Sequence, residues 1–176
     1  MDAIEPLAQK AAAGDAAAFG VLVRMHQSRL RGFLLRMTKG NAALADDLAQ
    51  ETFLEAFRKI AQFAGRSFFA WLCAIAYSKF LLEVRKRRLE PLEEADDMAA
   101  DLPEGESASL TRIDLERAMQ RLVPAQRAAL TLCFAQGFSH EEAATALNLP
   151  LGTLKSHVNR GRDRLSKLLG RSELVS

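Results

Sequence analysis

The chain has 176 residues, of which 49% are hydrophobic, enough to bury one ordinary core or two small ones, and this composition excludes an intrinsically disordered protein. Its 24 Lys and Arg nearly balance 22 Asp and Glu, so the net charge of +2 does not by itself indicate a nucleic-acid partner. The charges are unevenly distributed, however. Residues 89–110 hold eight acids and no base, and they separate two blocks, 1–88 and 111–176, in which bases exceed acids.

The spacing of apolar residues predicts three helices in the first block. Apolar residues recur every three or four positions from Phe19 to Met37, as in an amphipathic helix. The Gly-Asn pair at 40–41 is expected to end this helix. A second helix is predicted over residues 42–63 and a third over 67–88, and alternation typical of strands is nearly absent.

The acidic connector and the start of the second block follow. Residues 91–109 are expected to form a flexible, solvated linker, because the segment is too acidic to bury a core. A short helix is then predicted up to Leu122, with Pro124 closing it. A further helix is expected over residues 126–136, with Gly137 as its left-handed terminating residue.

The clearest local signal in the second block is a helix start at Ser139. Ser139 and Glu142 form an S-x-x-E capping box, in which each side chain accepts from the backbone N–H of the other residue. The helix should run to about Leu147, and Asn148 can adopt the left-handed conformation of a tight turn. A last helix opens near Leu151, so the sequence predicts a helix-turn-helix.

The last helix divides into an apolar stripe and polar faces. Its inward stripe is expected to comprise Leu151, Leu154, Val158, Leu165 and Leu168. In a helix-turn-helix module, the N-terminal part of the second helix enters the major groove of DNA. A solvated basic face on an ordinary core helix is the alternative interpretation. The residues expected to contact DNA are Thr153, Lys155, Ser156, Asn159, Arg160 and Arg162.

These motifs resemble those of the extracytoplasmic-function (ECF) sigma factors of bacterial RNA polymerase. The stretch GFSHEEAATALNLPLGTLKSHVNRGRDRL is similar to region 4 of that family, and DDLAQETF at 46–53 resembles the D-L-x-Q-E-x-F signature of region 2.2. FFAWL at 68–72 lies where the family has F-x-x-W-L. The resemblance implies an all-α fold with two small helical domains, 1–90 (region 2) and 110–172 (region 4), joined by the linker 91–109.

The region 2.2 motif indicates a surface for binding core RNA polymerase. Asp47, Gln50, Glu51 and Leu54 recur at helical spacing and should share one face. In the family this face binds the clamp helices of the polymerase, which the resemblance implies for these four residues. The alternative interpretation is that these charged residues form an ordinary solvent-exposed helix face without a partner. A metal site from Asp46, Asp47 and Glu51 is disfavoured, since no further ligand lies near them in sequence.

The third helix corresponds to the part of the family that opens the minus-10 promoter element by capturing a flipped base. This sequence departs from many members at Ser78, where they have Asn, and at Tyr77, so the identity of the captured base cannot be carried over. Trp71, in contrast, is interpreted as a core residue. The matching minus-10 residues are Tyr77, Ser78, Lys79, Arg85, Lys86, Arg87 and Arg88.

The expected function is that of an alternative sigma factor, a transcription initiation factor that recognises minus-35 and minus-10 elements. Its expected partners are core RNA polymerase, promoter DNA and an anti-sigma factor, with no small-molecule substrate, metal, cofactor or catalytic activity. No run of apolar residues is long enough to span a membrane, so we expect a cytoplasmic protein without membrane insertion, held at a membrane only through a membrane-bound anti-sigma factor.

Two other functions are compatible with parts of the sequence. A sigma-like mimic that sequesters an anti-sigma factor would keep the fold and lose the DNA and polymerase surfaces. A plain helix-turn-helix regulator would leave the region 2.2 motif without a role. The remaining candidates for chemistry receive structural interpretations: the three histidines are expected at the surface or at helix caps, and Cys73 and Cys133 as buried small apolar residues.

Overall fold

The computed structural model describes residues 4–64, 67–89 and 108–170, and every regular element in these ranges is helical. The predicted all-α fold is therefore confirmed. The linker prediction for 91–109 falls mostly on residues outside the described ranges. The helices are α1 Ile4–Ala12, α2 Ala16–Met37, α3 Ala42–Lys59, a 3₁₀ turn Ile60–Gln62, α4 Phe68–Leu89, α5 Ala108–Gln120, α6 Pro124–Leu130, a π-helical segment Thr131–Ala135, α7 His140–Leu147 and α8 Leu151–Leu168.

Helices α1 to α4 form an N-terminal unit around a core of large apolar side chains. Helix α2 packs against α1, α3 and α4, and Phe33, Phe68 and Leu72 are completely or almost completely buried among them. Asp15 caps α2 by accepting from the amide of Ala18 at 3.0 Å. The periodicity of the sequence did not predict α1, whose nine residues lie before the first long apolar series.

Helices α5 to α8 form a C-terminal unit whose local signals match the sequence. Both hydrogen bonds of the predicted capping box are present: Ser139 Oγ accepts from the amide of Glu142 at 3.1 Å, and the Glu142 carboxylate accepts from the amide of Ser139 at 2.9 Å. Asn148 adopts the left-handed conformation with φ 52°, and Gly137 does so with φ 73°. The helix-turn-helix is confirmed as α7 and α8.

Three sequence predictions for this unit need correction. Pro124 opens α6 as its first residue, where a missing N–H costs nothing, and it does not close the preceding helix. The predicted helix 126–136 changes to π-helical hydrogen bonding after Leu130. Leu168 is 37% exposed, whereas the stripe of α8 contains a buried Gly161, where a Cβ would lie 2.9 Å from the Leu130 side chain. The glycine thus lets α8 approach α6 closely.

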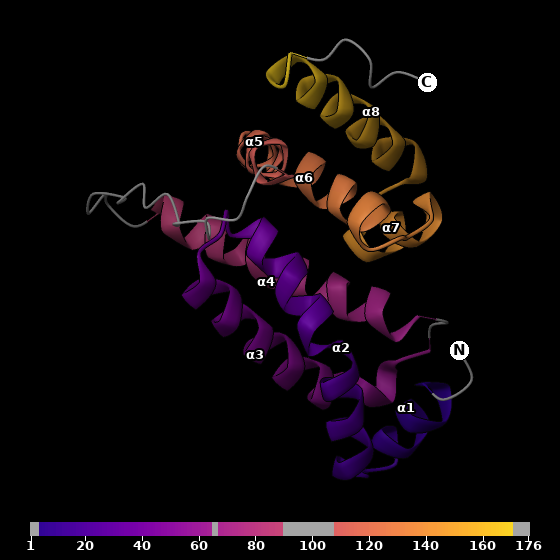
Figure 1. Cartoon of the computed structure of the whole chain (residues 1–176). Helices are drawn as coiled ribbons and strands as arrows, with labels where there is room; N and C mark the ends of the chain where they lie inside the picture. The colour runs from indigo at the N-terminus through magenta and orange to yellow at the C-terminus, as the bar shows by residue number, and fades with distance from the viewer. Residues whose placement is uncertain (1–3, 65–66, 90–107, 171–176) are drawn as a thin grey trace.

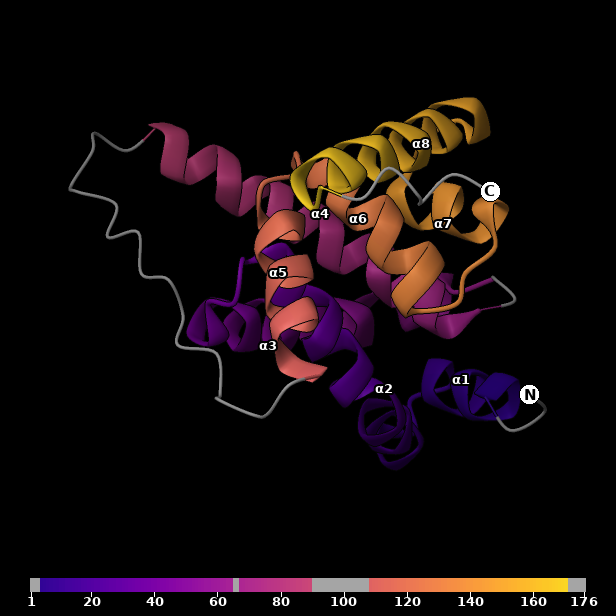
Figure 2. The same cartoon turned by 45° about the horizontal axis from the view of Figure 1, so that its top comes forward.

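The two units pack against each other (Figures 1 and 2). Helix α7 lies on α4, and α6 lies on α2. Phe69 and Phe138 make an edge-to-face contact across this interface, with ring centroids 5.8 Å apart. The regions that the sequence describes as separate domains are therefore in direct contact.

Candidate binding surfaces

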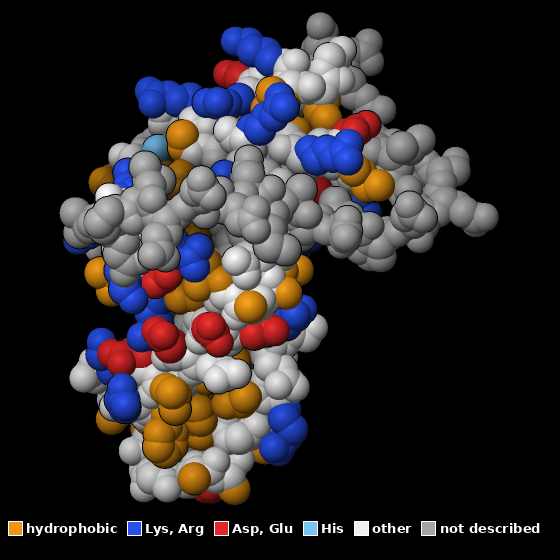
Figure 3. Space-filling model, turned by 90° about the vertical axis from the view of Figure 1, so that its left-hand side faces the viewer, with side chains coloured by type: hydrophobic (Ala, Val, Ile, Leu, Met, Phe, Trp, Pro, Cys, Tyr) orange, Lys and Arg blue, Asp and Glu red, His pale blue; other side chains and the backbone are white. Residues whose placement is uncertain are grey.

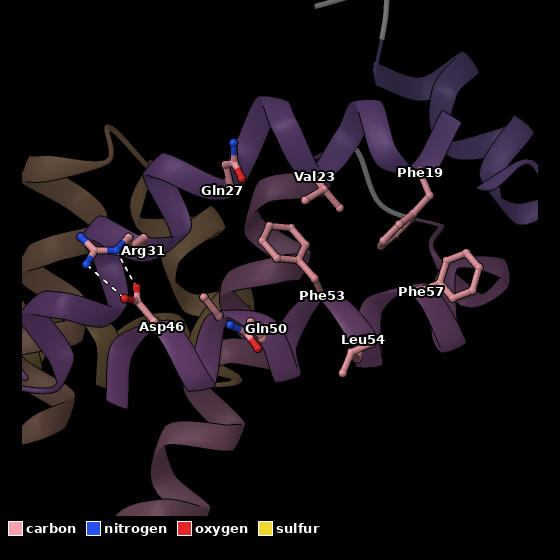
Figure 4. Close-up of a pocket in the computed structure, with 10 residues that line it drawn as sticks. Phe19, Val23, Gln27, Arg31, Asp46, Gln50, Phe53, Leu54 and Phe57 are labelled. Carbon is pink, nitrogen blue, oxygen red and sulfur yellow. Dashed lines mark hydrogen bonds and ion pairs between the residues drawn. The ribbon is translucent and has the colours of Figure 1, made fainter. Parts of the chain in front are cut away.

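An apolar groove runs between α2 and α3 and encloses about 690 Å³ (Figure 4). Helix α2 contributes side chains at intervals of four residues, and α3 contributes side chains at intervals of three and four, so each helix presents one continuous stripe. The lining residues are Phe19, Val23, Gln27, Arg31, Asp46, Ala49, Gln50, Phe53, Leu54 and Phe57.

The two ends of the groove differ in chemistry. At one end, Arg31 Nε donates to Asp46 Oδ1 at 2.6 Å, so a charged pair connects α2 with α3. At the other end, Phe19 and Phe57 meet edge to face with centroids 5.0 Å apart. Leu54 lies between these ends with 59% of its surface exposed. This arrangement suits an amphipathic segment with apolar side chains along its middle and a polar group at one end.

Two of the four predicted polymerase-binding residues, Gln50 and Leu54, line the groove. Asp47 and Glu51 are exposed on the adjoining face of α3, and the Glu51 carboxylate lies 3.5 Å from Lys79 Nζ on α4. The half of the groove that α2 provides was not predicted from the sequence. Its signal was the i, i+4 spacing that runs from Phe19 to Arg31.

The face of the molecule shown in Figure 3 carries apolar, acidic and basic side chains in separate areas. An apolar area lies low on this face, a row of acidic side chains lies above it, and basic side chains gather at the top, where Figure 1 places α8. Apolar and acidic surfaces thus belong to the N-terminal unit. A strongly basic surface belongs to the other end of the molecule.

The predicted minus-10 residues are spread along α4. Ser78 is exposed, as are the four basic residues 85–88 in the last turns of the helix. Tyr77 is only 7% exposed, and burial raises the pKa of its phenol. The structure therefore exposes the basic residues 85–88, leaves Lys79 half-buried and Tyr77 buried, and the role of these residues in DNA binding stays a prediction.

Helix α8 presents most of the predicted minus-35 residues to solvent. Leu154 and Val158 are buried against α6 and α7, which turns the opposite faces of the helix outward. The exposed members are Thr153, Lys155, Asn159 and Arg160, whereas Ser156 and Arg162 are half-buried. The role of these residues in minus-35 recognition stays a prediction.

Comparison with known proteins assigns the N-terminal unit to region 2 and the C-terminal unit to region 4 of sigma factors. The family model described as Sigma-70 region 2 matches residues 22–90, and that for Sigma-70, region 4 matches residues 112–165. The ECF RNA polymerase sigma factor EcfG of Rhodopseudomonas palustris is 42% identical over 144 residues, which cover 80% of this chain and 78% of that protein. The chain belongs to the ECF sigma factors. It is an alternative sigma factor, a transcription initiation factor that directs RNA polymerase to promoters.

Other similar proteins support the same family assignment. SigE of Mycolicibacterium smegmatis is 38% identical over 170 residues, which cover 91% of this chain and 66% of that relative. The solved structure of CnrH in complex with the cytosolic domain of CnrY is similar with a TM-score of 0.72, at 29% identity over 96% of this chain and 98% of that one. RpoE of Bartonella quintana, in complex with the anti-sigma factor NepR, has a TM-score of 0.70 at 30% identity over 88% of this chain and 98% of that one.

The expectation that all three histidines of this sigma factor lie at the surface or at helix caps is wrong for His26. It is buried where α2 meets α4, stacks on Phe69 at 5.7 Å, and neither ring nitrogen has a hydrogen-bond partner among the residues that the structure describes. Burial, together with the positive charge of Arg29, lowers the pKa of His26 below its usual value of about 6.5. The fold therefore favours the neutral imidazole over the protonated one.

This burial predicts acid sensitivity. As pH falls through about 6.5, His26 takes up a proton more readily in the unfolded chain than in the folded protein, so the free energy of unfolding should decrease with falling pH. In His26→Leu this part of the pH dependence should be absent. Urea unfolding at several pH values between 7.5 and 5.5 measures it. Equal slopes in the two proteins would contradict the prediction.

Cys73 and Cys133 do not form a disulfide bond with each other. Cys73 is completely buried, and burial raises the pKa of its thiol to about 12, which makes it an unreactive core residue as expected. Cys133 is half-buried in the π-helical segment. Within residues 4–64, 67–89 and 108–170, no cluster of three potential metal ligands occurs. No helix in the same ranges is long and apolar enough to cross a membrane.

Proposed function

We propose that this sigma factor binds core RNA polymerase through the surface of α2 and α3. The groove between these helices carries the proposal, because its exposed leucine and aromatic side chains would otherwise be left in water. Asp47 and Glu51 beside it provide negative charge that steers a basic partner surface into register. Gln50 and Leu54 then contact the partner directly.

The DNA contacts are proposed for two other surfaces. In this proposal helix α8 enters the major groove of the minus-35 element, and the exposure of Lys155, Asn159 and Arg160 in its N-terminal half supports it. The exposed bases 85–88 at the end of α4, together with Ser78, support opening of the minus-10 element, in which an unstacked base has to be held against its cost of extrusion. The protein acts by binding, and we assign it no catalytic step.

We further propose regulation by an anti-sigma factor in the cytoplasm. The similar structures of CnrH and RpoE were both determined in complexes, one with the cytosolic domain of CnrY and one with the anti-sigma factor NepR. The groove between α2 and α3 offers an apolar binding site that such a protein shares with the polymerase. Occupation of the groove by one partner would then exclude the other.

Transcription from a promoter library with purified core polymerase tests this function. We expect the full chain to confer initiation at a defined set of promoters, whereas core polymerase alone should initiate at none of them. Binding to promoter DNA without initiation would indicate a plain helix-turn-helix regulator. Binding to an anti-sigma factor without either activity would indicate a mimic.

A further inference from the structure

Lys79 of α4 lies against the acidic face of α3. Its Nζ atom is 3.5 Å from Glu51 Oε2, and its side chain is 23% exposed, whereas that of Glu51 is 59% exposed. Helices α3 and α4 pack against each other (Figure 1), so this ion pair joins the helix proposed to bind polymerase with the helix proposed to open the minus-10 element. A residue expected to contact DNA thus directs its charge toward the polymerase-binding surface.

Glu51 is the middle member of a row of three carboxylates on α3. Asp47, Glu51 and Glu55 follow one another at intervals of four residues, and side chains at this spacing share one helix face. We call these three residues the acidic row. Like charges four residues apart repel each other, so a cation beside the middle of the row relieves repulsion on both sides.

The three carboxylates differ in how far neighbouring cations already neutralise them. Glu55 pairs with Lys59 Nζ at 2.7 Å, and the hydrogen bond from Lys59, with a smaller contribution from the charge of Lys79, lowers the pKa of the Glu55 carboxyl. Glu51 pairs with Lys79. Asp47 forms no ion pair with any residue that the structure describes. Lys79 is therefore the cation that an approaching partner meets at Glu51.

The pair between Lys79 and Glu51 can exchange for a pair with a partner. Glu51 is well exposed to water, and an ion pair that includes an exposed group changes an equilibrium constant by up to about five-fold. A cationic side chain that binds Glu51 has to displace the Lys79 ammonium or share the carboxylate with it. A cation that binds Asp47 displaces nothing.

We propose that Lys79 competes with basic side chains of core RNA polymerase for Glu51 and so limits the affinity of this sigma factor for the enzyme. This inference rests on the proposed polymerase site of α2 and α3. It makes Lys79 a specificity-determining residue, because Lys79 disfavours a partner that needs Glu51 and leaves unchanged the affinity for a partner that fills only the apolar groove.

Binding of the full chain to purified core polymerase at two salt concentrations tests the competition. Lys79→Met removes the ammonium and keeps an unbranched apolar stem in this half-buried position. We expect it to raise the affinity about two- to five-fold at low salt, and by less at high salt, where screening weakens both pairs. In the background of Glu51→Gln, which removes the contested carboxylate, this gain should be absent.

Lys10→Met is the matched control, because Lys10 is exposed on α1 and its substitution removes one positive charge from the same unit outside the groove. It reports the general effect of net charge. If Lys79→Met binds no more tightly than Lys10→Met, or if its gain persists in the Glu51→Gln background, Lys79 does not compete for Glu51.

Leu54→Glu in the same assay separates this failure from failure of the proposed polymerase site. Weak binding by Leu54→Glu together with no gain in Lys79→Met overturns the competition alone. Binding by Leu54→Glu equal to that of the wild type overturns both, because the groove beside the acidic row would then not be the polymerase site.

Discussion

Leu54→Glu should lower the affinity for core RNA polymerase by about thirty-fold or more, the effect of losing one central apolar contact and placing a charge in its site. Leu54 is exposed on α3 and lines the groove, so the substitution removes no core contact and should leave the unfolding transition unchanged. A fluorescence or surface-binding assay with the full chain and purified core enzyme measures the affinity.

The matched control for this prediction is Leu82→Glu. Leu82 has 58% of its surface exposed, almost the same fraction as Leu54, but it lies on α4 outside the groove. We expect this variant to bind core polymerase as the wild type does. If the two variants bind equally well, α2 and α3 do not form the polymerase site.

Charge reversal at Asp47 probes the steering contribution of the same surface. Asp47→Lys should slow association with core polymerase more than it accelerates dissociation, because an exposed charge acts mainly before contact. The difference from the wild type should shrink as salt is raised, since screening shortens the range of the interaction. A difference that is independent of ionic strength would show that Asp47 acts by direct contact.

Arg160→Ala and Lys155→Ala should weaken recognition of the minus-35 element while the protein stays folded. Both side chains are exposed on α8, opposite the buried Leu154 and Val158, so neither substitution opens the core. Loss of a bidentate contact to a base should cost about 1–3 kcal/mol of discrimination between promoter and non-promoter DNA. Loss of a phosphate contact should weaken binding to all DNA sequences alike. It should also reduce the magnitude of the slope of log affinity against log salt concentration by about one.

Binding of the full chain with core polymerase to promoter and scrambled duplexes, at two salt concentrations, separates these outcomes. Arg164→Ala is the control, because Arg164 is exposed on the same helix but in its C-terminal half, away from the end that enters the groove. If promoter binding by Arg160→Ala and Lys155→Ala equals that of the control, α8 is not the recognition helix.

The sequence by itself determined the features that depend on neighbouring residues. The capping box at Ser139 and the left-handed turn at Asn148 involve hydrogen bonds and dihedral angles within a few residues, so the local sequence is sufficient to predict them. Helical periodicity also identified the outward face of α8. The motif in α3 and its helical spacing singled out Gln50 and Leu54, two of the residues that line the groove, whereas no motif marked the contribution of α2.

Only the tertiary structure decided which surfaces meet. The burial of His26 and the close approach at Gly161 depend on helices that pack from distant parts of the chain. Arg127 is the clearest case: in the sequence it belongs to a short polar helix start, whereas in the structure it caps a helix about 90 residues earlier. Local propensity carries no information on such a pairing, because the burial of a charge depends on what the rest of the fold places around it.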